Sequence, residues 1–304
     1  MSASGGRKAI VAALLANTGI AVSKFVGFLI TRSSSMLAES VHSVADAGNQ
    51  GLLLLGQQQA ARKADADHPF GYGRARFFWS FVVAVVLFAL GSLFALYEGI
   101  AKLRSPHDIE SVPVAIGILT LAILLETYSF RTAIVEANHV RHDEGWVSFI
   151  RHAKSPELPV VLLEDAGALL GLILALMGVG LALITGDPMW DALGTLSIGV
   201  LLGAISIVLA VEMRSLLIGE GASPADSALI HATIENTTDV RRLIHVKTLY
   251  LGPDELMVAA KVEVAAAVVT SADVAAVIND TEARIRDAVP TARVIYLEPD
   301  VYHS

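Results

Sequence analysis

The chain has 304 residues, of which 54% are hydrophobic and only 17% are charged, with a net charge of −8 and a mean hydropathy of +0.60. Soluble domains carry about a quarter charged residues, so this composition indicates a protein embedded in lipid, and the acidic balance gives no sign of nucleic-acid binding. The absence of cysteine excludes disulfides, thiolate metal sites and thiol catalysis, so any metal site must use His, Asp and Glu.

Six apolar segments reach the ~20 residues that are needed to cross the hydrocarbon core of a bilayer. They cover residues 9–31, 34–57, 77–103, 112–136, 158–185 and 190–218. The second segment has the lowest hydropathy because it carries Glu39, His42, Asp46, Asn49 and Gln50. Its position between two clearly apolar segments favours a span with one polar face over a loop. We therefore expect an α-helical transmembrane domain over residues 1–220.

The basic residues of the short loops predict the orientation, because cytoplasmic loops carry an excess of Lys and Arg. The loops on the side of both termini hold most of the basic residues, whereas the opposite loops hold only Arg32, Lys102 and Arg104. Both termini are therefore expected in the cytoplasm or an equivalent compartment. No cleavable signal peptide and no Arg-rich, Ser-rich presequence precede the first segment, which favours the inner membrane of a bacterial cell.

Residues 221–304 contain no spanning segment and predict a small cytoplasmic domain. The expected order is a helix over 226–236, a strand over 241–251, a second strand over 256–264, a helix over 271–288 and a strand over 293–298. The turn residues Gly252, Pro253 and Asp254 between two alternating strands are typical of a hairpin. This α-β-β-α-β order predicts a two-layer α+β domain.

The second segment carries the strongest functional signal. Glu39, His42, Asp46 and Asn49 are three or four residues apart and fall on one stripe of a helix, so His42 and Asp46 can contact one ion together. Ionisable groups at membrane depth are costly and usually face the bundle interior, where they serve a function. The alternative is structural: His42 and Asp46 pair with each other or with Lys24.

A second acidic cluster, Glu164 and Asp165, lies in the fifth segment. Adjacent helical residues point about 100° apart, so we expect at most one of the two to face the site directly. Asp165 is the stronger candidate because Gly167 and Ala168 let another helix approach closely. Glu164 either assists as a ligand or pairs with a cation such as Lys24.

His42, Asp46 and Asp165 together provide one nitrogen and several carboxylate oxygens. This set suits zinc and also manganese, cobalt or ferrous iron. Ligands must lose their protons to bind a metal, and histidine titrates near neutrality. Metal release and proton uptake are therefore expected to be coupled.

Several motifs are similar to those of the cation diffusion facilitator family. The matching residues are Asn17 and Lys24, residues 35–46, residues 67–74, residues 190–199 and residues 216–220, so the similarity covers nearly the whole chain. Residues 46–50, 126–131 and 163–165 resemble the branch that includes the mitochondrial zinc exporter. The resemblance implies a homodimer of six-span protomers with cytoplasmic ferredoxin-like domains. It also implies that the protein exchanges zinc or another divalent metal for protons by alternating access, and that it carries no prosthetic group.

The resemblance also implies a metal site with two ligands on the second span, matching His42 and Asp46, and two on the fifth. Asp165 matches one of the latter, but Val161 stands where the family has a histidine. The fourth ligand is thus Glu164, a water or another residue. Asn17, Lys24, Glu39 and Asn49 are expected to support the site or line the pathway.

An accessory metal site is implied in the loop after the second span. Asp65 and His68 match its ligands, but Tyr72 replaces a second histidine, and the loop sequence is also compatible with a purely structural role.

Three other functions fit parts of this pattern. A membrane protein that binds or senses a metal without moving it would use the same ligands. A membrane metalloenzyme would use three ligands and one open position, but the sequence shows no nucleophile or hydrolase motif, so we do not expect an enzyme. A passive channel would conduct without proton exchange.

Overall fold

The computed structural model describes residues 18–106, 111–141, 145–268 and 270–302. These residues form two compact units. The first contains the described parts of Met1–Gln57 and Phe78–Met213, and the second contains the described parts of Gln58–Phe77 and Arg214–Ser304. The first unit is helical, and the second holds the only sheet found in the described part of the chain.

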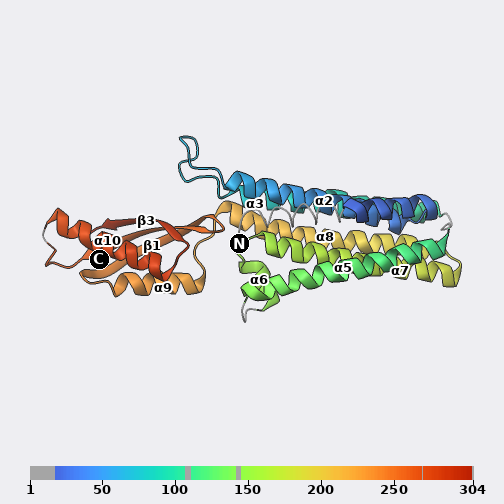
Figure 1. Ribbon diagram of the computed structural model, residues 1–304. Coiled ribbons are helices and arrows are strands. Elements are labelled where there is room, and N and C mark those ends of the chain that lie inside the picture. Colours follow the sequence, from blue (N-terminus) through green and yellow to red (C-terminus); the bar gives the residue numbers. More distant parts are fainter. Residues whose placement is uncertain (1–17, 107–110, 142–144, 269, 303–304) are drawn as a thin grey trace. The chain divides into compact units, whose positions relative to one another are not determined.

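The helices of the first unit and their continuations run through most of the chain (Figure 1). A helix covers Thr18–Thr31. It is followed by α2 (Ser34–Ala60), α3 (Ala75–Val86), the π-helical turn η1 (Leu87–Leu93), α4 (Phe94–Arg104), α5 (Val112–Arg141), α6 (Trp146–His152), α7 (Glu157–Thr185) and α8 (Met189–Ile218). The segments α3, η1 and α4 follow one another without a break, so they form a single helical rod over Ala75–Arg104.

Four helices in the described residues are long and apolar enough to cross a membrane. They are Ala75–Arg104, Val112–Arg141, Glu157–Thr185 and Met189–Ile218, and they correspond to the last four predicted spans. The polar stripe of α2 keeps that helix outside this group, and Thr18–Thr31 is shorter. The remainder of the first predicted span, with Asn17, lies outside the described residues. A helical membrane protein is confirmed, whereas the number of six spans stays a prediction.

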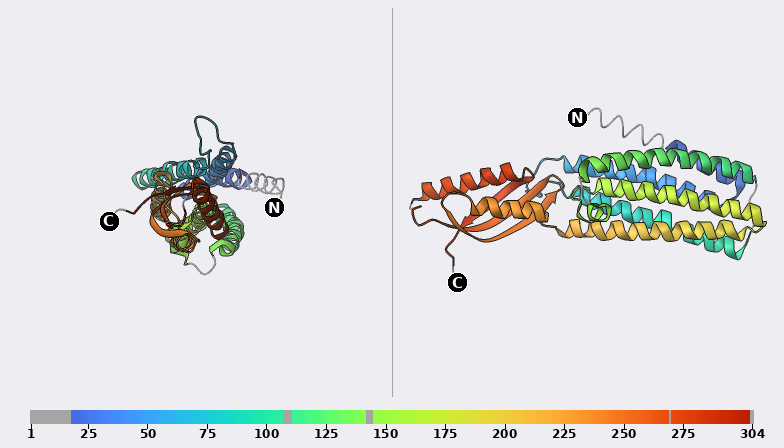
Figure 2. Two further views of the ribbon diagram at one scale, coloured as in Figure 1. Left: turned by 90° about the vertical axis from the view of Figure 1, so that its left-hand side faces the viewer. Right: turned by 90° about the horizontal axis from the view of Figure 1, so that it is seen from below.

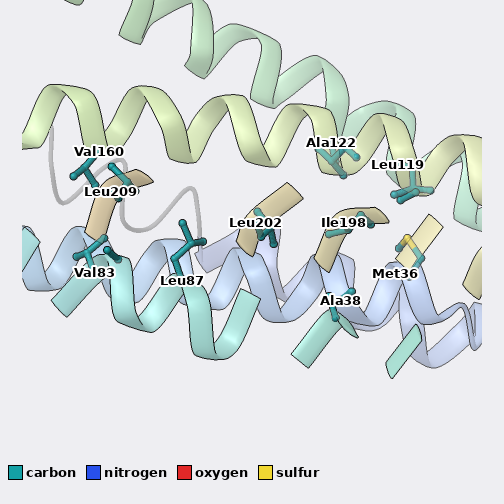
Figure 3. Close-up of a cluster of buried hydrophobic side chains, with 14 of the residues drawn as sticks. Met36, Ala38, Val83, Leu87, Leu119, Ala122, Val160, Ile198, Leu202 and Leu209 are labelled. Carbon is teal, nitrogen blue, oxygen red and sulfur yellow. The ribbon is translucent and has the colours of Figure 1, made fainter. Parts of the chain in front are cut away.

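Apolar side chains from α2, α3, α5, α7 and α8 form the core of the first unit (Figure 3). Met36, Leu119, Val160 and Leu202 are each at most 1% exposed within it. Lipid tails are as apolar as these side chains, so close van der Waals packing rather than water exclusion holds such helices together.

Small residues permit that close packing where the rod Ala75–Arg104 crosses α8. A Cβ atom on Gly99 would lie 2.7 Å from Leu196, and one on Gly199 would lie 2.8 Å from Leu96. Ser92, within η1, donates a hydrogen bond of 2.8 Å to the carbonyl oxygen of Gly199. Side chains larger than hydrogen at these two glycines would therefore push the helices apart.

Asp191 of α8 binds the N-terminus of α2. Its carboxylate is fully buried and accepts hydrogen bonds from Ser33 Oγ at 2.9 Å, from the Ser34 amide at 2.9 Å and from the Ser35 amide at 3.4 Å. The first amides of a helix have no partner within the helix, and the positive end of the helix dipole favours an anion. Asp191 thus satisfies these donors from another helix.

Replacing Asp191 by alanine is expected to cost about 3 kcal/mol of stability, because buried donors would lose their acceptor. Thermal unfolding of the detergent-purified protein measures the loss. Asp187→Ala is the matched control, since Asp187 is exposed and its carboxylate accepts a hydrogen bond from the nearby Met189 amide. Equal melting temperatures for the two variants would contradict this role of Asp191.

The second unit has a three-stranded sheet with two helices (Figure 2). Its elements are α9 (Pro224–Glu235), β1 (Val240–Gly252), β2 (Glu255–Val264), α10 (Ser271–Ala288) and β3 (Ala292–Pro299). The strand order is β1-β2-β3, with β1 antiparallel and β3 parallel to β2. Because α9 contacts β1, α10 contacts β3 and the helices contact each other, both helices cover the same face of the sheet.

Candidate cation site among α2, α5 and α7

The polar stripe of α2 is buried in the first unit. Glu39, His42 and Asn49 are fully buried, and the side chain of Asp46 is 16% exposed. His42 Nε2 lies 3.5 Å from Asp46 Oδ2, so the two side chains stack one helical turn apart, as their spacing predicts. The stripe faces other helices, since the described surroundings bury it almost entirely.

A small cavity of about 20 Å³ lies beside this stripe, which is room for one or two water molecules or a bare cation. Its acidic lining comes from three helices: Asp46 on α2, Glu126 on α5, and Glu164 and Asp165 on α7. The remaining lining residues are Ile20, Ser43, Gln50 and Val161. His42 is one turn from Asp46 but does not line the cavity.

Both Glu164 and Asp165 line the cavity, whereas we expected at most one of them to face the site directly. Glu164 Oε1 accepts a hydrogen bond of 2.6 Å from Asn49 Nδ2 on α2. Asp165 Oδ2 accepts one of 3.0 Å from Ser129 Oγ on α5. Glu164 thus contacts α2 and Asp165 contacts α5, which fits two adjacent side chains that point about 100° apart.

Lys24 does not pair with the cavity carboxylates. Its ammonium lies 3.2 Å from Glu39 Oε2 and donates a hydrogen bond of 2.8 Å to Ser43 Oγ, and both charged side chains are fully buried. The structural alternatives in which Lys24 pairs with Asp46 or Glu164 are therefore not what the structure shows. Lys24 and Glu39 instead form a buried ion pair beside the site.

Several buried polar atoms around the cavity have no hydrogen-bond partner in the described structure. They are Asp46 Oδ1, Asn49 Oδ1, Gln50 Oε1 and both ring nitrogens of His42. Buried polar atoms are paired in the great majority of cases, so a cluster of unpaired atoms needs a reason. These atoms are oxygens and imidazole nitrogens, which are the groups that bind a divalent cation.

The described side chains do not form a complete coordination shell. No group of three or more His, Asp or Glu residues within the described ranges is close enough to hold one ion. His42, Asp46 and Asp165 are thus brought to one region, but they need side-chain rotation to reach a common ion. Carboxylates that share a site repel one another, and a cation between them reverses the sign of that interaction.

Glu126 is the residue of the cavity that the sequence interpretation did not include among the ligands. It is the one acidic residue between Val112 and Val135, in an otherwise largely apolar helix. An ionisable residue in an otherwise apolar segment is the same signal that identified the second and fifth segments. Whether Glu126 faces α7, however, depends on how the helices pack, and the local sequence does not show this.

The accessory loop uses its acidic residue to shape a turn. Asp65 accepts hydrogen bonds from the His68 amide at 2.8 Å and from Tyr72 Oη at 2.6 Å. The Tyr72 hydrogen bond lowers the pKa of Asp65, and the same bond raises the pKa of Tyr72. Both carboxylate oxygens of Asp65 are therefore in use, which agrees with the structural interpretation of this loop. Metal binding by Asp65 and His68 stays a prediction.

Comparison with known proteins adds an independent observation. The family model described as the cation efflux transmembrane domain matches residues 10–218. The chain is 34% identical to a protein named proton-coupled zinc antiporter SLC30A9, mitochondrial, of Xenopus laevis, over 88% of this chain and 48% of that protein. It is 32% identical to the human protein of that name, over 88% and 47%, and 30% identical to metal tolerance protein C4 of Arabidopsis thaliana, over 84% and 57%. The chain thus spans about half the length of these relatives.

Proposed function

Since this chain belongs to the cation efflux family, we propose that it carries divalent metal cations, zinc foremost, across a membrane in exchange for protons. Membership in this family makes the chain a transporter rather than an enzyme, and the metal is its cargo rather than a prosthetic group. The observation that supports the proposal most directly is the small cavity with four carboxylates, next to His42, among membrane-length helices.

The proposed binding residues are His42, Asp46, Glu164 and Asp165. Two lie on α2 and two on α7, so one ion would connect two helices that different parts of the chain provide. Bare carboxylates in a low-dielectric interior repel one another and favour either a cation or protons. Metal and protons therefore compete for the same groups, which is the physical basis of exchange.

The membrane arrangement belongs to the same proposal. We infer six spans, with the Thr18–Thr31 helix and α2 as the first two, and both termini on the side rich in Lys and Arg. The family resemblance implies a homodimer, and we propose the inner membrane of a bacterial cell as its location. The names of the relatives refer to a mitochondrial proton-coupled zinc antiporter, which agrees with zinc as cargo and protons as the exchanged ion.

Zinc uptake into sealed proteoliposomes with an imposed pH step tests this function. We expect zinc flux that reverses when the pH step is reversed. Zinc binding without flux would support a sensing or storage protein. Flux that is independent of the proton gradient would support a passive channel.

Val161→His is expected to tighten zinc binding by about tenfold, because it adds an imidazole one turn before Asp165 in the cavity lining. Calorimetric titration of the purified protein with zinc measures the change. Leu170→His is the matched control, since Leu170 is on the same helix but 48% exposed and outside the cavity. An equal effect of both histidines would show that Val161 does not mark the ion position.

A further inference from the structure

We propose that Glu126 of α5 supplies an oxygen ligand in place of the imidazole that is missing at Val161, and that it sets the metal preference of the site. This inference rests on the proposed transport function. It places a ligand on a third helix, outside the α2 and α7 pairs that the sequence resemblance implies. It also makes the site richer in oxygen than a site with two histidines.

The position of Glu126 on α5 is the first argument. The buried residues of this helix form one stripe and are Ala115, Leu119, Ala122, Ala133 and Ala137. Glu126 follows Ala122 by four residues and precedes Ala133 by seven, so it lies on the same face at 3.6 residues per turn. A single carboxylate thus interrupts a stripe of small apolar side chains at the level of the cavity.

The neighbours of Glu126 show that it does not face the bilayer. Leu124, Leu125 and Tyr128 are 64%, 45% and 73% exposed and occupy the outer face of α5. Glu126 is partly buried and lines the cavity together with Asp46, Glu164 and Asp165. In a membrane, the polar surroundings of this carboxylate are therefore those of the candidate cation site.

The contact between α5 and α7 holds Glu126 in place. The two helices pack against each other (Figure 1). Ser129, three residues after Glu126, donates the 3.0 Å hydrogen bond to Asp165. Residues three apart on a helix share a face, so Glu126 and the Ser129–Asp165 contact lie on the same side of α5.

The ligand chemistry then predicts the class of metal. His42 is the one nitrogen donor among the five residues His42, Asp46, Glu126, Glu164 and Asp165. Carboxylate-rich sites suit harder ions such as Mn²⁺, whereas imidazole favours Zn²⁺. We therefore expect the protein to bind Mn²⁺ as well as Zn²⁺, and we expect Glu126 to maintain the affinity for Mn²⁺.

Titration of the purified full chain with Zn²⁺ and, separately, with Mn²⁺ tests this role. Glu126→Gln is expected to weaken Mn²⁺ binding at least tenfold and Zn²⁺ binding less. Glu126→His is expected to increase the preference for Zn²⁺ over Mn²⁺, measured as the ratio of the two dissociation constants, at least tenfold. Glu126→Asp keeps a carboxylate and is expected to retain binding of both metals, which separates ligation from a role in folding.

Glu136→Gln and Glu136→His are the matched controls, because Glu136 is on the same helix and exposed. They are expected to leave both affinities and their ratio unchanged. If the Glu126 variants behave like the Glu136 variants while the wild type binds and transports metal, the role of Glu126 is overturned and the transport function stands. If the wild type neither binds nor moves either metal, the transport function itself fails.

Discussion

Replacing Asp46 by asparagine is expected to reduce zinc uptake into proteoliposomes by about 100-fold or more, while the protein still folds. Asp46 is the residue that joins the two halves of the site: it lies 3.5 Å from His42 and also lines the cavity. Its Oδ1 atom is buried without a hydrogen-bond partner. The change to asparagine therefore removes the negative charge of the ligand without breaking a hydrogen bond to Oδ1. Mutation of residues that only support a metal ligand already costs about 10- to 100-fold.

Asp187→Asn is the control for this experiment, because it makes the same chemical change at an exposed loop position. It is expected to transport like the wild type. Size-exclusion chromatography and the melting temperature of both variants show whether they fold. Zinc flux retained in a folded Asp46→Asn variant would remove Asp46 from the site, and with it the main support for the proposed pathway.

Replacing Lys24 by methionine is expected to destabilise the protein by about 3–5 kcal/mol, the usual cost of leaving one partner of a buried ion pair unpaired. Lys24 and Glu39 are both fully buried and are 3.2 Å apart. The substitution leaves the Glu39 carboxylate without its counter-ion in the helix bundle. Equilibrium unfolding in mixed detergent micelles measures the change in free energy.

A second substitution separates the ion pair from simple loss of a lysine. In Lys24→Met with Glu39→Met, neither charge of this pair remains, and most of the lost stability is expected to return. Lys63→Met is the matched control, because Lys63 is exposed in the loop after α2 and its loss is expected to have little effect. A double variant as unstable as Lys24→Met would show that the lysine acts through packing instead of charge.

The sequence predicts the elements of this chain where local patterns suffice. The apolar segments identify the four membrane-length helices from Ala75 onward. The polar stripe identifies α2 in spite of its low hydropathy, because Glu39, His42, Asp46 and Asn49 repeat at helical spacing. The small C-terminal sheet domain follows from alternating strands around a Gly-Pro-Asp turn. Each of these signals involves residues a few positions apart.

The candidate site was less predictable because it depends on contacts between distant helices. His42 and Asp46 are one turn apart, so their stacking follows from helix geometry alone. That Glu164 and Asp165 both reach the cavity depends on the positions of Asn49 and Ser129 on two other helices. The place of Glu126 beside them likewise requires the packing of α5 on α7, which no local pattern contains.

The hydrogen bonds of Asp191 limit how α2 could move in the proposed transport. They fasten the N-terminus of α2 to α8, so this end of α2 stays in place when the rest of the helix moves. A rocking movement of α2 displaces its far end most and its fastened end least. His42 and Asp46 lie about two and three turns from that end, so such a movement would carry them through a short arc only. Any opening that the proposed transport needs at the fastened end would have to come from helices other than α2.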